Sequence, residues 1–121
     1  MDRYPRLILY PDRIAENASK VVALCASRGV EVSAVTKGVC ADLRVARGML
    51  AGGCASFADS RVQNLKLLKK EFPGTPRTLL RIPMKSELED VVRSADCSLI
   101  SMTESLEALE THCQRLDAVH G

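Results

Sequence analysis

Residues 30–37 read VEVSAVTK, a β-rich and mostly uncharged run that ends on Lys37 and is followed by Gly38. Valine and threonine at this density favour a short strand. The strand therefore ends in an ammonium group at the point where it meets the next loop. The rest of the chain is best understood by asking which other polar groups reach the same place.

The run at residues 30–37 belongs to a regular alternation of apolar runs and amphipathic stretches. Each amphipathic stretch carries apolar residues at helical spacing and ends near glycine or proline. The sequence therefore predicts the order βαβαβαβαβα. The predicted strands are residues 6–10, 30–37, 54–58, 78–82 and 97–101.

Polar residues that favour helix starts precede the predicted helices. Ser, Thr and Asp side chains at such positions accept hydrogen bonds from the first free backbone amides. Ser86 and Glu89 also have the spacing of a capping box. The predicted helix caps are Asp12, Asp42, the pair Asp59 and Ser60, Ser86 and Thr103.

Four predicted strands end on polar residues at intervals of about 20 to 22 residues, namely Lys37, Asp59, Arg81 and Ser101. Alternation at this period implies parallel strands with right-handed crossovers. Parallel strands end at the same edge of the sheet, and ligand sites of α/β proteins lie at that edge. We therefore expect these four residues to share one rim.

Two α/β architectures fit the pattern. A doubly wound sheet could be complete at this length, but the first predicted strand–helix turn, Tyr-Pro-Asp, has no glycine-rich phosphate loop. The alternative is a partial (β/α)8 TIM-type barrel of about five parallel βα units. A whole barrel has about 250 residues, so on this alternative residues 1–121 would be the N-terminal portion of a barrel domain and would be truncated.

Composition excludes several function classes. Hydrophobic residues make up 46% and charged residues 26% of the 121 residues, as in ordinary globular domains. The net charge is +2, and the aromatic residues are two Tyr and two Phe. Without a basic patch or a stacking platform, no nucleic-acid partner is expected.

The five cysteines lie far apart and form no zinc motif, so no metal site is expected. Unpaired cysteines in this spacing fit a reducing compartment. No secretory signal and no apolar run of membrane-spanning length is found, so we expect no membrane association and a cytoplasmic location.

Residue chemistry alone leaves two interpretations of the rim open. Lys37 is either a solvated charge at a strand end or an amine whose partly desolvated position allows a Schiff base with a carbonyl compound. Arg81 is either a surface cation or an anion contact. Asp59 and Ser60 are helix caps or site residues, and Arg61 reaches the site or the solvent.

Three segments carry a resemblance to a known family: AVTKGVC at residues 34–40, FADSRVQNLKLL at 57–68 and TLLRIPM at 78–84. Together they resemble the N-terminal barrel domain of the alanine racemase-like, fold-type III pyridoxal-phosphate proteins, in the alanine/ornithine racemase branch. The similarity runs from YPRLILYPDRIAEN to SLISMTESLEAL. Its most specific part is the Thr-Lys of the second predicted strand combined with ADSR after the third.

The resemblance implies that Lys37 matches the lysine that carries pyridoxal 5'-phosphate as an internal aldimine. It also implies that this lysine transfers a proton on one face of an amino-acid substrate. In alanine racemases a tyrosine from the C-terminal domain of the partner subunit serves the other face. Tyr4 and Tyr10 lie in the first predicted strand region and do not match it.

The resemblance further suggests that Arg81 lies near the cofactor's phenolic oxygen or the substrate carboxylate, where its guanidinium would suit bidentate contact with an anion. Asp59, Ser60, Arg61 and Ser101 are the other expected rim residues. The groups that hold the phosphate and the pyridine nitrogen in this family lie in later parts of the barrel. The full-length protein is expected to be a homodimer that acts on a small amino acid.

Two other functions remain open from the sequence. The first is a non-catalytic pyridoxal-phosphate homeostasis protein, although those proteins tend to have a YGEN-type segment where this chain has FADSR. The second is an inactive half-barrel that self-associates through unpaired strand edges. If the chain is the N-terminal portion of a racemase, these 121 residues alone are expected to bind the cofactor weakly and to have little or no racemase activity.

Overall fold

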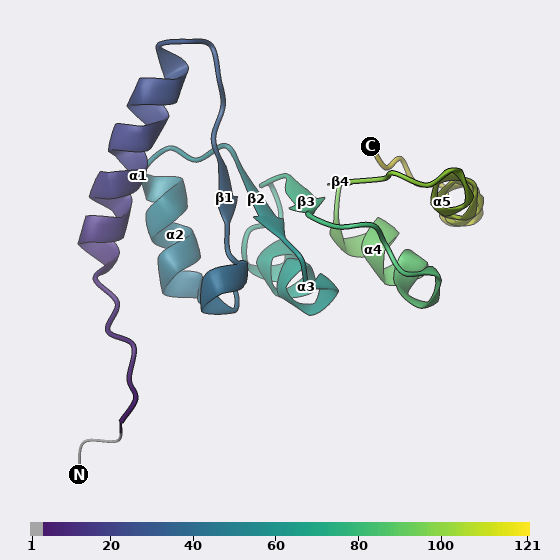
Figure 1. Cartoon of the computed structure of the whole chain (residues 1–121), viewed down its shortest axis with the longest axis horizontal. Helices are drawn as coiled ribbons and strands as arrows, with labels where there is room; N and C mark the ends of the chain where they lie inside the picture. The colour runs from purple at the N-terminus through teal and green to yellow at the C-terminus, as the bar shows by residue number, and fades with distance from the viewer. Residues whose placement is uncertain (1–3) are drawn as a thin grey trace.

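The computed structural model describes residues 4–121, which form one parallel sheet with helices between consecutive strands (Figure 1). The strands are β1 (Ser33–Val35), β2 (Ser56–Asp59), β3 (Arg77–Leu79) and β4 (Cys97–Ser98). The helices are α1 (Pro11–Ala26), α2 (Leu43–Ala51), α3 (Val62–Glu71), α4 (Leu88–Ser94) and α5 (Thr103–Leu116), with short 3-10 helices η1 (Lys37–Val39) and η2 (Lys85–Glu87). None of the helices within this described part could cross a membrane.

One face of the sheet is buried against α2, α3 and α4. Ala34 of β1 pairs with Phe57 of β2, and both side chains are buried, whereas the next residue, Val35, is 44% exposed. Side chains alternate between the two faces of a strand, so Ala34 faces the helices and Val35 the other side. The resulting core consists of Ala34, Ala41, Ala46, Phe57, Val62, Leu65, Leu68, Leu79, Val91 and Ala95.

Sheet order distinguishes the two architectures that the sequence left open. The strands lie in the order β1-β2-β3-β4, so each strand pairs with its neighbour in the sequence. A doubly wound sheet reverses its strand order and carries helices on both faces. Sequential order with helices on one face is instead the wall of a (β/α)8 barrel. The predicted fold class, a partial barrel of parallel βα units, is confirmed.

Helix α1 packs against α2 through a close approach at Gly52. A Cβ atom at Gly52 would lie 2.4 Å from the Cβ of Ala18 and 2.6 Å from the backbone oxygen of Ala15. Real Cβ atoms do not come so close to other atoms, so only glycine fits here. Small residues at this contact let the two helix backbones approach each other.

The C-terminal residues continue the sheet beyond β4. Gly121 donates its N–H to the Asp96 oxygen (2.9 Å), and its own oxygen accepts the Ser98 N–H (2.9 Å). His120 bonds Ser98 Oγ through Nε2 (2.7 Å) and the Ala95 oxygen through Nδ1 (3.2 Å). These backbone bonds have the pattern of a parallel ladder, so the chain resumes an extended course beside β4 after α5.

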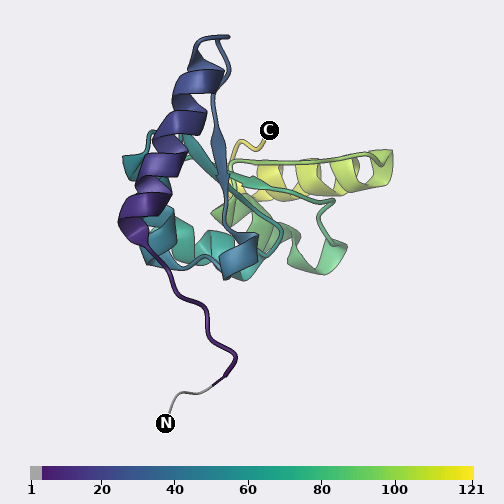
Figure 2. The same cartoon turned by 60° about the vertical axis from the view of Figure 1, so that its left-hand side comes forward.

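The prediction of a strand at residues 6–10 is wrong. This segment is an extended arm outside the sheet, and Leu7 and Ile8 are 72% and 55% exposed. Figures 1 and 2 both show it running away from the helices and strands. An apolar run becomes a strand only when it meets a partner strand, and the arm meets none among residues 4–121.

Several predicted helix starts need correction. Helix α1 begins at Pro11, so Asp12 lies inside its first turn, and α5 begins at Thr103 itself, with Met102 before it. The capping box assigned to Ser86 and Glu89 is not formed. Its place is taken by Glu87, which accepts the Met84 N–H. The reason is that η2 comes directly before α4, so the first free backbone amide of this turn belongs to Met84. Its hydrogen-bond acceptor is then Glu87 rather than Glu89.

Asp42 caps α2 as predicted, because its carboxylate accepts the N–H groups of Arg44 and Val45. Strands β3 and β4 end earlier than predicted. Arg81 therefore lies two residues beyond β3, and Ser101 three residues beyond β4, in the loops rather than in the strands.

The His120 contacts predict a pH dependence of stability. Burial lowers the pKa of His120 below its ordinary value of 6.5. Neutral His120 donates Nδ1–H to Ala95 and accepts the Ser98 hydroxyl at Nε2, and protonation removes that acceptor. Because the unfolded chain binds the proton more readily, the stabilisation is present above pH 6.5 and decreases as the pH falls below it.

Urea denaturation at pH 7.5 and 5.5 tests this expectation. The free energy of unfolding of the His120→Gln variant should change less between the two pH values than that of the wild type. His112→Gln, at a half-buried site on α5, is the matched control and should retain the wild-type difference. An unchanged pH dependence in His120→Gln would contradict the assignment.

Candidate functional site

Lys37 lies where the chain leaves β1, at the carboxyl edge of the sheet, which we call the rim. It is the first residue of η1, and its side chain is exposed. Within residues 4–121 its Nζ atom makes no hydrogen bond or ion pair. The amine is therefore available to a ligand, whereas the residue before it is fully buried.

Asp59 ends β2, as predicted, but its side chain points into the protein. It is fully buried, and its carboxylate accepts hydrogen bonds from the Thr36 hydroxyl (2.7 Å), the Asn64 amide (3.1 Å to each oxygen) and the Arg61 N–H (2.9 Å). We call these four residues the Asp59 network. Asp59 therefore lies beneath the rim and is unavailable to a ligand above it.

Arg81 is fixed at the rim by contacts to two neighbouring segments. Its Nε atom donates to the Ser60 oxygen (2.6 Å), and Nη2 donates to Glu87 Oε2 (3.0 Å). Nη1 donates to the other oxygen of Glu87 and to the Ile82 oxygen. The Arg81 hydrogen bond lowers the pKa of Glu87, although burial opposes this, and the same bond raises the pKa of Arg81.

These contacts limit how Arg81 can bind an anion. A guanidinium has five N–H bonds, and four of them are used by Ser60, Ile82 and Glu87. One N–H on Nη2 remains. Bidentate contact with a ligand, as the resemblance suggested, would require Arg81 to leave Glu87.

The remaining predicted rim residues lie at different distances from Lys37. Lys37, Ser60 and Arg81 follow adjacent strands, and Arg81 Nε contacts the Ser60 oxygen directly. Arg61 is exposed at the start of α3. Ser101 follows β4, which is three strands from β1, or about 14 Å at the usual strand spacing. Ser101 is therefore not next to Lys37.

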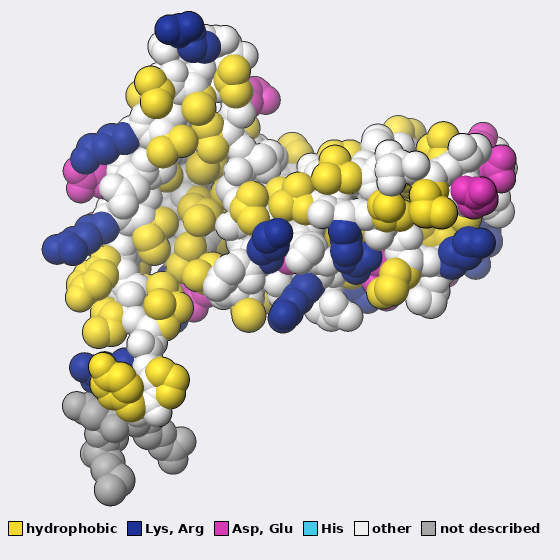
Figure 3. Space-filling model, viewed as in Figure 1, with side chains coloured by type: hydrophobic (Ala, Val, Ile, Leu, Met, Phe, Trp, Pro, Cys, Tyr) yellow, Lys and Arg dark blue, Asp and Glu magenta, His cyan; other side chains and the backbone are white. Residues whose placement is uncertain are grey.

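The grooves found in the described residues lie away from these rim residues. One runs between α1 and β1, is mainly apolar and is lined by Ile14, Ala18, Val32, Val35 and Met49 among others. Figure 3 shows hydrophobic side chains gathered over this region.

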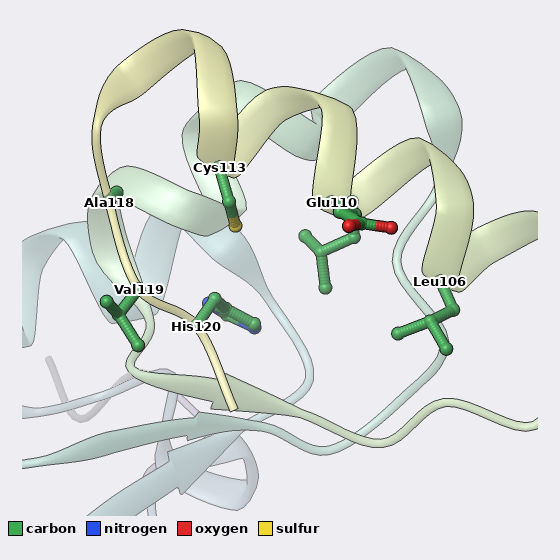
Figure 4. Close-up of a pocket in the computed structure, with 7 residues that line it drawn as sticks. Leu106, Glu110, Cys113, Ala118, Val119 and His120 are labelled. Atoms are coloured by element: carbon green, nitrogen blue, oxygen red, sulfur yellow. The ribbon is translucent and has the colours of Figure 1, made fainter.

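A second groove lies between α5 and the C-terminal residues, lined by Leu106, Leu109, Glu110, Cys113, Ala118, Val119 and His120 (Figure 4). Figure 4 shows the side chains of Cys113 and His120 on facing sides of this groove. Neither groove includes Lys37 or Arg81.

Sequence reasoning missed three residues that organise the rim: Thr36, Asn64 and Glu87. Thr36 occupies a helix-facing position of a strand, and Asn64 lies one helical turn before Leu68 on the buried side of α3. A polar residue at a buried position needs a partner, which was the available signal. Glu87 had no such signal, because its pairing with Arg81 depends on the turn at Pro83.

Comparison with protein families gives a match to the family described as alanine racemase, N-terminal domain, over residues 10–120. The chain belongs to this family. The match includes the whole sheet, all five helices and Lys37.

Two curated relatives are racemases. The chain is 38% identical to ornithine racemase of Acetoanaerobium sticklandii over 117 residues, which are 97% of this chain and 33% of that protein. It is 39% identical to lysine racemase of Thermotoga maritima over 98 residues, which are 81% of this chain and 28% of that protein. The chain thus spans about a third of the length of these relatives.

Among solved structures, PipY of Synechococcus elongatus PCC 7942 with pyridoxal phosphate bound has the same fold. Its TM-score is 0.69 at 20% identity, covering 83% of this chain and 50% of that one. At this identity the likeness concerns the fold.

The Asp59 network predicts that replacing the Asp59 carboxylate by a neutral amide lowers the free energy of unfolding. In Asp59→Asn, the new amide group would place its own N–H bonds against the donors of Thr36 or Asn64. An unsatisfied buried donor costs about 1–3 kcal/mol, so we expect about 2 kcal/mol lower free energy of unfolding in urea. The exposed residue Asp117 supplies the control, and a loss in Asp59→Asn no larger than in Asp117→Asn would be evidence against the network.

The Arg81–Glu87 ion pair should make a second contribution to the free energy of unfolding, and this contribution should be lost in acid. Because Arg81 lowers the pKa of Glu87, the contribution is present above the ordinary carboxyl pKa of 4.5 and is lost as the pH falls below it. For a partly exposed pair we expect about 1 kcal/mol. Urea denaturation of Glu87→Gln should show this loss at pH 7 and a smaller one at pH 3.5. Glu31→Gln, at an exposed site before β1, should show no such difference.

Proposed function

We propose that the chain is the pyridoxal-phosphate-binding part of an amino-acid racemase, with Lys37 as the lysine that holds the cofactor. The observation that carries this proposal is an exposed amine without a partner in residues 4–121, at the carboxyl end of a parallel strand in this family's domain. The racemase relatives and the cofactor in the PipY structure support it.

The donor set at the rim fits the cofactor. An aldehyde needs a nearby amine, which Lys37 supplies, and an anionic oxygen needs an N–H donor, which the remaining N–H of Arg81 Nη2 supplies. Ser60, which follows β2, adds a neutral hydroxyl between them. Lys37 brings a positive charge without a partner in residues 4–121, and Arg81, whose charge is paired with Glu87, adds one N–H, so this edge would bind a phosphorylated, anionic molecule.

Lys37 would perform two chemical tasks. The Nζ amine would hold the cofactor at its aldehyde carbon. With an amino-acid substrate present, the same amine would be the base that accepts the proton from the substrate Cα. When bound, pyridoxal phosphate supplies the electron sink for the electron pair of the broken Cα–H bond.

Racemisation needs a second acid on the opposite face of the substrate. The two tyrosines of the chain, Tyr4 and Tyr10, are exposed in the N-terminal arm, and Arg13 lies over the Tyr10 ring at 4.9 Å. Lys37 alone therefore accounts for proton exchange on one face. Cofactor binding without turnover is a second candidate function, because both tyrosines of the chain lie in the exposed N-terminal arm.

Reductive labelling tests the role of Lys37. The protein is incubated with pyridoxal phosphate, reduced with borohydride and digested, and the modified lysines are identified by mass spectrometry. We expect preferential labelling of Lys37 and its loss in Lys37→Ala. Lys85→Ala, at another exposed lysine beside the rim, should not reduce labelling of Lys37. Labelling spread evenly over surface lysines would contradict the proposal.

Hydrogen exchange in the substrate separates the two candidate functions. The loaded protein is incubated in D2O with L-ornithine, L-lysine or L-alanine, and deuterium at Cα is measured by mass spectrometry. A racemase-type Lys37 should incorporate deuterium into at least one of them, with loss of at least tenfold in rate in Lys37→Ala. No incorporation above that seen with the free cofactor would favour binding without turnover.

A further inference from the structure

The Asp59 network connects three elements directly behind Lys37. Thr36 ends the β1 ladder, Asp59 ends β2, and Asn64 lies in the first turn of α3. Thr36 and Asp59 are fully buried, and Asn64 is 9% exposed. A buried carboxylate requires several donors to offset its lost hydration. Because the donors come from Thr36 and Asn64, the need to satisfy Asp59 joins β1, β2 and α3 at the rim.

Asp59 obtains these donors without a cationic side chain among the described residues. Oδ1 accepts the Arg61 N–H at 2.9 Å and the Asn64 amide at 3.1 Å, and Oδ2 accepts the Thr36 hydroxyl at 2.7 Å and the Asn64 amide at 3.1 Å. The Thr36 bond is the only one of these that reaches β1. Loss of the Thr36 hydroxyl would therefore detach β1 from the carboxylate while α3 remained attached.

Every polar atom of Thr36 has a partner. Its N–H donates to the Ala58 oxygen at 3.0 Å, and its own oxygen accepts the N–H groups of Val39 and Ala41, each at 3.1 Å. Its hydroxyl donates to Asp59. Thr36 is thus fixed by both neighbouring elements, and the next residue in the chain is the exposed Lys37.

We propose that Thr36, Asp59 and Asn64 form a positioning network for Lys37, in which the hydroxyl of Thr36 sets the place from which the lysine side chain leaves the sheet. This inference rests on the proposed role of Lys37 as cofactor lysine. A lysine side chain has four rotatable bonds, so the backbone supplies the positional accuracy. A displacement of about 1 Å at a reacting group costs up to about a hundredfold in rate.

The test compares Thr36→Val, which removes the hydroxyl at nearly constant shape, with Thr36→Ser, which keeps it. The affinity for pyridoxal phosphate is measured from the absorbance change on binding, and the extent of labelling at Lys37 from borohydride reduction. Thr36→Val should bind on the order of tenfold more weakly, because the end of β1 would no longer hold Lys37 in one place before the cofactor binds. Thr36→Ser should bind within about threefold of the wild type.

Hydrogen exchange supplies a readout that does not depend on the cofactor. In apo Thr36→Val, the amides of Val39 and Ala41, which bond the Thr36 oxygen, should exchange about tenfold faster than in the wild type. Amides in α4 should exchange at the wild-type rate. If Thr36→Val does not fold, Thr36→Ala takes its place, because it removes the hydroxyl without adding a methyl group in its position.

Thr78→Val is the matched control. Thr78 lies in the same sheet, and its hydroxyl contacts Cys97 Sγ at 2.9 Å without reaching Asp59. Thr78→Val should leave both readouts within about twofold of the wild type. The inference is overturned if Thr36→Val binds as the wild type does, or if exchange accelerates equally throughout the chain. Absence of Lys37 labelling in the wild type would refute the proposed function, whereas local acceleration of exchange would still report the backbone role of Thr36.

Discussion

A buried carboxylate that lacks a cationic partner among residues 4–121 sets the geometry of the rim. Asp59 has lost its hydration, and this loss is tolerated only because a hydroxyl, a side-chain amide and a backbone amide all point at it. Those donors come from β1 and from α3, so satisfying the carboxylate fixes both elements relative to β2. The end of β1 is thereby held in one place, although its next residue faces solvent.

The rim combines two kinds of positive charge. Arg81 is paired with Glu87 and bonded to Ser60, so its position is determined and most of its donors are used. Lys37 Nζ makes neither an ion pair nor a hydrogen bond within the part of the chain that the structure describes. A cation that is already paired contributes to structure and local potential, whereas an amine without a partner is free to react. The two residues are therefore suited to different tasks at one edge of the sheet.

The alternation of apolar runs was sufficient to predict the parallel order of the strands and the partial barrel, because hydrophobic periodicity and turn residues are local signals. The same signals failed for residues 6–10, where the apolar pattern was present and the partner strand was not. The position of Asp59 at the end of β2 was predictable. Its inward direction was not, because one residue of difference in strand register decides which face a side chain takes. Lys37 as the cofactor lysine remains a prediction.

Side-chain pairings that form only in the folded chain explain the rest of what the sequence did not reveal. Glu87 meets Arg81 across the turn at Pro83, and Thr36 meets Asp59 from another strand. Such contacts depend on the folded arrangement rather than on neighbours in the chain. Thr36 and Asn64 each had a readable signal, since a polar residue on the buried side of a strand or helix requires a partner, but this signal does not identify the partner.

The contact at Gly52 has a consequence for how the molecule opens. Helix α1 has no fully buried side chain, although Ile14, Ala18 and Val22 lie against the glycines of the α2 segment. The α1 side chains at this contact thus stay partly exposed, whereas α3 and α4 contribute several fully buried side chains to the core. Native-state opening should thus occur at two levels, with α1 leaving at a lower free energy than the unit of β2, α3, β3 and α4. Strand β1, with Lys37 at its end, lies at the border between these two cooperative units.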